Sequence, residues 1–128
     1  MNSCTTKGIS ISVESFYNEK HSDPNKGQFV HSYQVSIVNN SKHTVQLIRR
    51  HWIIVDSLGP IREVEGEGVI GEQPVLSPGG KHEYTSWCPM KTEIGKMSGT
   101  YQMYNLDLEE AFFVTIPEFR LIANARLN

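Results

Sequence analysis

Apolar and polar residues alternate along most of the chain, and this alternation predicts short β-strands. Ile9, Ile11 and Val13, for example, are separated by serines. Because successive side chains of a strand point to opposite faces, such a segment has one face toward a core and one toward water. The segment 45–56 is apolar on both faces near its end, so we expect it to lie centrally in a sheet. The predicted strands cover 9–14, 28–37, 45–56, 61–65, 81–88, 96–105 and 112–116.

Clusters of turn-forming residues separate these strands. The polar segment 18–27 predicts a loop, and shorter turns are expected at 39–41, 57–60 and 77–80, because Asn, Ser, Gly and Pro favour turn conformations. The segment 107–110 is predicted to be the hairpin loop between the last two strands.

Two prolines are expected to interrupt strands, since proline has no backbone N–H to donate to a ladder. Pro89 is predicted to break the strand that precedes it. Pro117 is predicted to require either an edge position or a strand end.

The arrangement of these elements predicts a fold class. No segment has apolar residues at helical spacing over three turns, and no internal repeat is visible. Several short strands separated by turns favour an antiparallel sandwich. We therefore predict an all-β, immunoglobulin-like or fibronectin type III-like β-sandwich. A length of 128 residues predicts one domain, 1–128. The strand pattern, which runs from Ile9 to Leu121, places its core over about 9–121.

Composition and charge narrow the classes of partner and compartment. The formal net charge is −2, so the whole molecule offers no attraction to nucleic acid, and no nucleic-acid partner is expected. The sequence shows no signal-peptide pattern and no apolar run of about 20 residues, which predicts a cytoplasmic protein without a membrane span. Cys4 and Cys88 are then expected to be free thiols, with Cys88 partly buried and structural.

The glycine-rich segment GEGVIG, with Gly66, Gly68 and Gly71, is a candidate ligand site. In dinucleotide-binding enzymes, GxGxxG brings the backbone close to a pyrophosphate at a helix N-terminus. Here no βαβ unit surrounds the segment, and neighbouring glutamates would repel phosphate. Two interpretations stay open: an anion-binding turn assisted by Arg62, or glycines that serve positive-φ turns and a bulge.

The other reactive residues form no recognisable motif. Strand alternation places Arg50 and Trp52 on one face and His51 on the other, with Trp52 as a core anchor and the arginine head groups in water. The five histidines lack metal-binding spacing, although His31 and His51 could approach each other on neighbouring strands. No nucleophile motif is present, so we predict no catalytic residue, metal ligand or cofactor.

Four motifs in a fixed order resemble the bacterial ApaG family: RHW at 50–52, VxGxGVxGxQPxLxPG at 64–79, MxGxYxM at 97–103 and IPxFxL at 116–121. They lie within the longer segments LIRRHWIIVDSLGPIREVEGEGVIGEQPVLSPGG, YTSWCPMKTEIGKMSGTYQM and FFVTIPEFRL. The resemblance covers roughly 9–121. It departs from the family at Trp87-Cys88, where a smaller residue is expected. It implies an immunoglobulin-like or fibronectin type III-like β-sandwich, in agreement with the strand pattern.

The resemblance also implies a role. The family is associated with cobalt resistance and with magnesium and cobalt efflux, and its genetic neighbours include a diadenosine tetraphosphate hydrolase. Similar domains occur in eukaryotic F-box proteins and in a protein that interacts with DNA polymerase δ, which implies protein binding. We therefore expect a non-enzymatic domain that binds an unidentified protein partner.

Two alternative ligands and one assembly stay open at this point. The alternatives are a nucleotide polyphosphate bound through Gly66, Gly68, Gly71 and Arg62, and a directly bound divalent cation. An exposed edge strand could also pair two copies into a homodimer.

Overall fold

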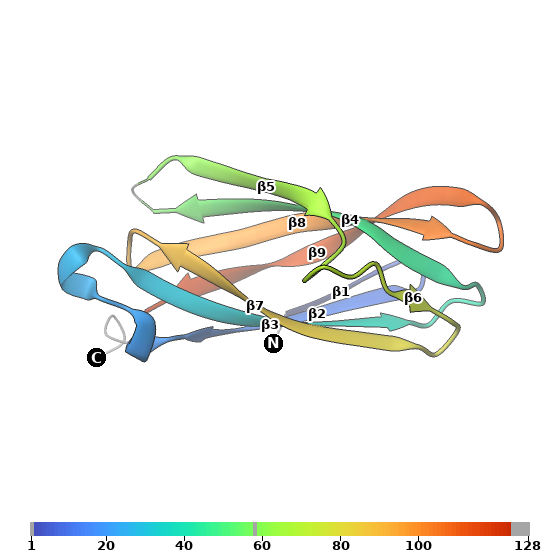
Figure 1. Ribbon diagram of the computed structural model, residues 1–128, viewed down its shortest axis with the longest axis horizontal. Coiled ribbons are helices and arrows are strands. Elements are labelled where there is room, and N and C mark those ends of the chain that lie inside the picture. The colour runs from blue at the N-terminus through green and yellow to red at the C-terminus, as the bar shows by residue number, and fades with distance from the viewer. Residues whose placement is uncertain (1, 58, 124–128) are drawn as a thin grey trace.

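Two antiparallel β-sheets pack face to face in the computed structural model, which describes residues 2–57 and 59–123 (Figure 1). Leu58, within the predicted turn at 57–60, lies outside the described residues, as do Met1 and residues 124–128 of the predicted domain. The strands are β1 (Asn2–Thr6), β2 (Ile9–Tyr17), β3 (Phe29–Asn39), β4 (Val45–Asp56), β5 (Ile61–Glu67), β6 (Val75–Leu76), β7 (Lys81–Met90), β8 (Ile94–Asn105) and β9 (Glu110–Ile122). Two single-turn 3-10 helices, η1 (Glu19–His21) and η2 (Pro24–Lys26), lie in the predicted loop 18–27.

The strand order confirms the predicted sandwich. Over the described residues, one sheet has the order β1-β2-β3-β7 and the other has the order β5-β4-β8-β9, with β6 paired to β4. The architecture is that of an immunoglobulin-like or fibronectin type III-like sandwich. Among the described residues, no helix has the length and apolar character needed to cross a membrane.

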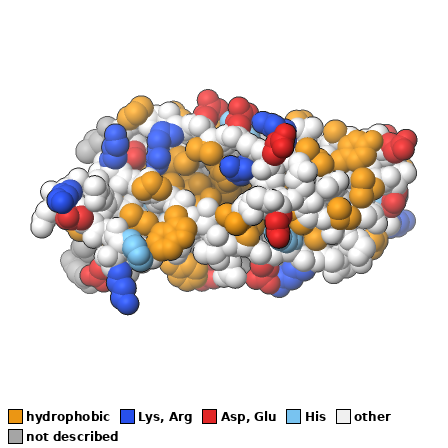
Figure 2. Space-filling model, viewed as in Figure 1, with side chains coloured by type: hydrophobic (Ala, Val, Ile, Leu, Met, Phe, Trp, Pro, Cys, Tyr) orange, Lys and Arg blue, Asp and Glu red, His pale blue; other side chains and the backbone are white. Residues whose placement is uncertain are grey.

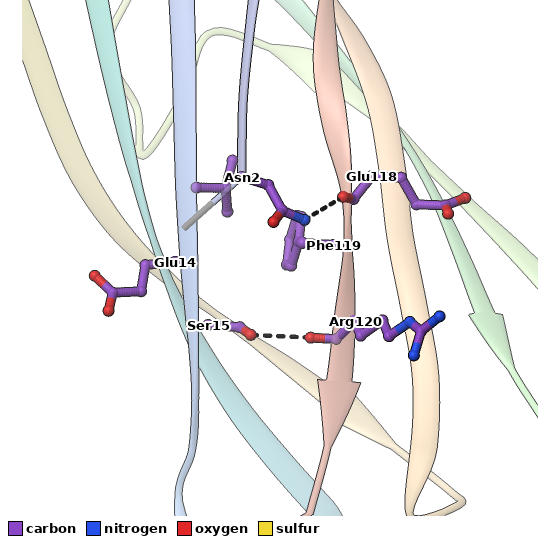
Figure 3. Close-up of a pocket in the computed structure, with 7 residues that line it drawn as sticks. Asn2, Glu14, Ser15, Glu118, Phe119 and Arg120 are labelled. Carbon is purple, nitrogen blue, oxygen red and sulfur yellow. Dashed lines mark hydrogen bonds between the residues drawn. The ribbon is translucent and has the colours of Figure 1, made fainter.

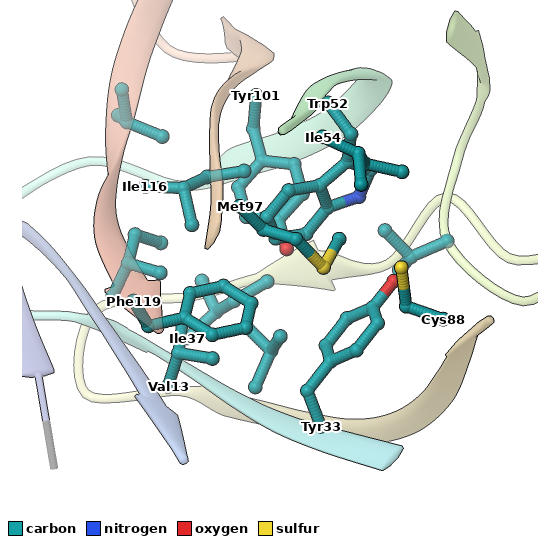
Figure 4. Close-up of a cluster of buried hydrophobic side chains, with 14 of the residues drawn as sticks. Val13, Tyr33, Ile37, Trp52, Ile54, Cys88, Met97, Tyr101, Ile116 and Phe119 are labelled. Atoms are coloured by element: carbon teal, nitrogen blue, oxygen red, sulfur yellow. The ribbon is translucent and has the colours of Figure 1, made fainter. Parts of the chain in front are cut away.

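The core lies between the inward faces of the two sheets, as the period of two predicts. Trp52 of β4 is 2% exposed and makes edge-on ring contacts with Tyr33, Tyr101 and Phe119, which come from three other strands (Figure 4). Burying an aromatic ring of this size contributes roughly 2–3 kcal/mol. The hydroxyls of Tyr84 and Tyr101 bond to each other inside the sandwich, so these polar groups are not left without partners. Trp52 is the core anchor that the sequence predicted.

The side of the sandwich between β9 and the β1–β2 hairpin is closed. Side-chain bonds join the two sheets there: Asn2 Nδ2 donates to the Glu118 carbonyl, and Ser15 Oγ donates to the Arg120 carbonyl (Figure 3). The inward-facing Ile116 and Phe119 of β9 are 1% and 3% exposed. A shallow cleft of about 470 Å³ at this seam is bridged by these bonds.

The opposite side, between β5 and β7, is more open. Val64 points inward from β5, opposite Trp52 of β4, yet remains 39% exposed. Figure 2 looks onto this side and shows hydrophobic side chains gathered between the two strands, with a Lys or Arg side chain among them. The sandwich is therefore asymmetric: Ile116 and Phe119 are buried at one edge, whereas Val64 is partly exposed at the other.

The alternation pattern did not predict β1. The segment NSCTT contains no alternating apolar residues, and it forms a strand because it pairs with β2 across the two-residue Lys7-Gly8 turn, both of whose φ angles are positive. Cys4 lies on β1 and Cys88 on β7, the two opposite edges of one sheet, and both are free thiols.

The predicted strand break at Pro89 is wrong. β7 continues to Met90, with Pro89 opposite Val30, because β7 is an edge strand and an edge tolerates a residue without an N–H. Pro117 does lie on an edge strand, β9, as predicted, but that strand does not end there. A register shift opposite Met97 and Gly99 accommodates the proline, and β9 continues to Ile122.

Candidate functional site

The glycine-rich segment forms the end of β5 and a tight hairpin that follows it. Gly66 lies in β5, and the Gly68 amide donates to the Ile48 carbonyl at 2.8 Å. Val69 and Glu72 then exchange two backbone hydrogen bonds around a two-residue turn. The turn residues, Ile70 and Gly71, have φ angles of 48° and 74°, the signature of a type I′ turn.

Local geometry explains two of the glycines. At Gly66, a Cβ would lie 2.8 Å from the Arg50 guanidinium, which crosses the strand and donates to the carbonyls of Glu67 and Gly68. At Gly68, φ is 64° and a Cβ would lie 2.2 Å from the Glu72 carbonyl oxygen, a contact that no side chain can make. Gly68 is therefore required by the backbone, whereas a side chain at Gly66 would displace the Arg50 guanidinium from its place.

The hairpin uses many of the donors that an anion would need. The amides of Gly68, Val69 and Glu72 all donate to carbonyls of the protein itself. The exposed carboxylates of Glu67 and Glu72 flank the segment. Polyphosphate binding at this segment stays a prediction.

Arg62, the residue predicted to assist the glycines, lies near the other end of β5. It is opposite Ile54, whereas Gly66 is opposite Arg50. Its Nη2 donates to the Pro89 carbonyl at 2.7 Å and lies 3.9 Å from Cys88 Sγ. The structure thus brings Arg50 to the glycines and uses Arg62 to link β5 to β7. The prediction that both arginine head groups of the RRH run lie in water is wrong for Arg50.

The histidines are dispersed over the molecule. His31 lies on the inward face of one sheet, on β3, whereas His51 lies on the outer face of the other sheet. The expected approach of these two residues is therefore wrong. His51 contacts Glu63 and Glu65 at 2.9 Å and 3.5 Å. Among residues 2–57 and 59–123, no three His, Cys, Asp or Glu side chains gather closely enough to hold a metal ion.

Cys88 is a poor nucleophile in this environment. It is 2% exposed, and burial raises the pKa of its thiol above the ordinary value, an effect that outweighs the nearby Arg62. The raised pKa keeps the Cys88 thiol protonated at neutral pH. Because the thiolate is the reactive form, the thiol is then a weak nucleophile. Its position supports the structural interpretation made from the sequence.

Two exposed aromatic residues that belong to no sequence motif lie on the outer face of the β1-β2-β3-β7 sheet. Phe16 of β2 is opposite Ser32 of β3, and Ser32 is opposite Trp87 of β7. We call these three residues the aromatic row. Phe16 and Trp87 are 48% and 50% exposed, and the small Ser32 separates them. The alternation itself could have revealed these aromatics, because Phe16 and Trp87 occupy outward-facing positions of their strands, where polar residues are expected.

A loop holds one end of the aromatic row in place. The His21 ring of η1 meets the Trp87 ring edge-on, with centroids 5.1 Å apart. His21 Nδ1 is in turn 3.0 Å from Asn18 Oδ1. Strands lie about 4.8 Å apart, so the two aromatic side chains stand about 10 Å apart with a shallow gap at Ser32. Half-exposed aromatics on the outer face of a sheet are suited to burying a partner's side chain.

Comparisons with known proteins place the chain in a family. An ApaG domain matches residues 19–105. Protein ApaG of Paramagnetospirillum magneticum is 50% identical over 121 residues, covering 94% of this chain and 92% of the relative, and Protein ApaG of Brucella suis biovar 1 is 49% identical with the same coverage. The crystal structure of the ApaA protein from Bordetella pertussis superposes with a TM-score of 0.87 at 44% identity, covering 90% of this chain and 93% of that one. The chain therefore belongs to the ApaG family.

Proposed function

We propose that this chain is a non-enzymatic domain that binds a protein partner through the aromatic row. The observation that supports the proposal is the exposure of Phe16 and Trp87 in one register on the outer face of this sheet. Aromatic residues of this kind dominate the binding energy of many protein interfaces. The connection with cobalt and magnesium efflux that the family resemblance implies would then run through the partner.

The test is affinity capture with matched variants. Immobilised wild-type protein, the Trp87→Ser variant and the Phe113→Ser variant are incubated with lysate of the source organism, and captured proteins are quantified by mass spectrometry. Phe113 is the control because it is 63% exposed but lies on β9 of the other sheet. We expect a protein whose recovery falls at least about tenfold with Trp87→Ser and is unchanged with Phe113→Ser, since losing a central aromatic costs about 2 kcal/mol. Equal recovery by all three proteins would contradict the proposal.

The two alternative ligands are tested by thermal unfolding. A ligand that binds only the native state raises its stability by mass action. ATP and diadenosine tetraphosphate test the segment with Gly66, Gly68 and Gly71, and cobalt and magnesium chlorides test direct cation binding. A melting shift with either class, together with no captured partner, would favour that class over protein binding.

A further inference from the structure

β5 has an unpaired edge. In the part of the chain that the structure describes, β5 pairs with β4 on one side, and no strand pairs with its other side. Half of the backbone amides and carbonyls of such a strand point away from the sheet, where they can form a ladder with another extended segment.

The inward face beside this edge lacks a cover. Val64 is 39% exposed, whereas Ile116 and Phe119, inward residues of β9 at the other edge of the same sheet, are 1% and 3% exposed. The uncovered stretch has definite ends. Arg62 bonds to the Pro89 carbonyl at one end, and Glu72 lies 3.7 Å from His82 at the other. An apolar side chain that points inward from an added strand would cover Val64.

The outward face of β5 carries a row of negative charge. Glu63, Glu65 and Glu67 all point outward, and the first two side chains are 63% and 62% exposed. His51 of β4 contacts both Glu63 and Glu65, and Arg49 of β4 lies opposite Glu67. Opposite charges across neighbouring strands stabilise a pair and like charges destabilise it, so the face favours Lys or Arg on an added strand.

This charge pattern disfavours a second copy of the chain as the added strand. When two β5 strands pair antiparallel across a two-fold axis, residues on the same face lie opposite each other, so the glutamates of one copy would face those of the other. The open edge of β7 is also a poorer template, because Pro89 removes one donor.

We infer that the open edge of β5 binds an extended segment of another protein as an added strand, with Lys or Arg on its outward face and apolar residues on its inward face. This surface lies on the sheet opposite to the aromatic row. It extends the proposed protein-binding function to a second site, which is tested with substitutions at different residues.

The test uses a synthetic peptide of about nine residues in which lysine alternates with valine. The peptide is titrated into the full chain, and binding is followed by backbone amide NMR shifts and calorimetry. We expect shifts concentrated on residues 61–67 and affinity that weakens as salt is raised, because exposed charges are screened. An acidic peptide, with glutamate in place of lysine, should bind at least about tenfold more weakly.

Two controls separate strand addition from simple charge attraction. The double variant Glu63→Lys, Glu65→Lys should lose the basic peptide and bind the acidic one, whereas Glu109→Lys, Glu110→Lys, a matched exposed pair in the distant β8–β9 hairpin, should behave like wild type. Two further peptides are N-methylated, one at the odd and one at the even residues, so each keeps its charge and loses one set of backbone donors. The peptide that loses the donors facing β5 should bind at least about tenfold more weakly than the other.

Several outcomes would overturn the inference. They are equal binding by both methylated peptides, shifts located away from β5, or unchanged affinity in the Glu63→Lys, Glu65→Lys variant. Concentration-dependent dimerisation through β5, seen by sedimentation, would show that a second copy occupies the edge instead. None of these results depends on Trp87, so failure here leaves the aromatic row untouched.

Discussion

At the scale of single residues, His31 is a histidine whose protonation the fold controls. It lies on the inward face of β3, is 1% exposed and packs against the Tyr17 ring at 5.3 Å between centroids. Its Nε2 has no hydrogen-bond partner among the described residues. Burial lowers the pKa of His31 from 6.5 to about 4, although the nearby Asp56 opposes the shift. The native state therefore holds a neutral imidazole.

This burial predicts how stability depends on pH. Because the pKa is lower in the native state than in the unfolded chain, the unfolded chain binds more protons between pH 6.5 and pH 4. The contribution of neutral His31 to the free energy of unfolding is fully present above pH 6.5 and is lost as the pH drops toward 4. The loss is about 2 kcal/mol between pH 7 and pH 5. Urea unfolding at both pH values measures the loss. It should shrink in His31→Leu and persist in His21→Gln, an exposed control; an unchanged pH dependence in His31→Leu would contradict the assignment.

Ile70 predicts a gain in stability. A β-branched residue at a φ of 48° is strained, and Ile70 is 60% exposed, so little packing offsets the strain. Asn-Gly is the preferred pair in a type I′ turn. We expect Ile70→Asn to stabilise the protein by about 1 kcal/mol in urea unfolding. Ile61→Asn, at a similarly exposed position on a strand, should give no gain.

At this scale the sequence predicted which face a residue occupies better than which residues it contacts. Alternation placed Arg50 with Trp52 correctly, because strand geometry alone decides it. It could not show that Arg50 reaches Gly66 or that Arg62 reaches Pro89, since the first contact depends on the register of β4 with β5 and the second on the approach of two sheets.

At the scale of elements, Arg62 is the link between two edge strands of different sheets. Its guanidinium on β5 donates to Pro89 on β7 and lies 3.5 Å from Met90 Sδ. We expect Arg62→Met to destabilise the protein by about 1 kcal/mol, the net value of a typical hydrogen bond, because methionine keeps much of the side-chain length without the donor. Urea unfolding measures the change. Arg49→Met, an exposed position on the same sheet, is the control and should change stability by less than about 0.5 kcal/mol.

Strands with strong alternation were predictable from the sequence, and the exceptions have local causes. The prediction for β4 has the observed bounds because apolar residues recur from Val45 to Val55 and turn-forming residues follow Asp56. β1 has no such run and exists through its pairing with β2. The predicted break at Pro89 was wrong because the effect of a proline depends on whether its strand lies at an edge, and sheet order cannot be read from alternation. At Pro117 the edge position was among the predicted alternatives, but the continuation of β9 depends on a register shift with β8.

At the scale of the whole molecule, the sandwich has a rigid centre and unequal edges. β4 and β8 lie at the middle of one sheet, with neighbours on both sides, whereas β5 has a neighbour on one side only within residues 2–57 and 59–123. Hydrogen exchange should reflect this order, with the slowest amides in β4 and β8 and faster ones in β5. Mass spectrometry of exchange in the intact chain measures it, and protection of β5 equal to that of β8 would contradict the open edge.

The class of fold was predictable from the sequence, but the asymmetry of the two sides was not. Many short strands and turns are sufficient to predict a sandwich. The closed side depends on Asn2 and Ser15 bonding across the sheets, and the open side on Val64 lacking a cover. These are relations between segments far apart in the chain.

The seam between β1 and β9 has a consequence for the order of folding. The bond from Asn2 to Glu118 joins residues 116 positions apart, so forming it closes a loop of almost the entire chain. Closing so long a loop has a large entropic cost, and contacts offset this cost only after the intervening strands are in place. Docking of β1 onto β9 is therefore expected to follow the folding transition state. Changes at this seam should then alter how fast the protein unfolds and leave its rate of folding nearly unchanged.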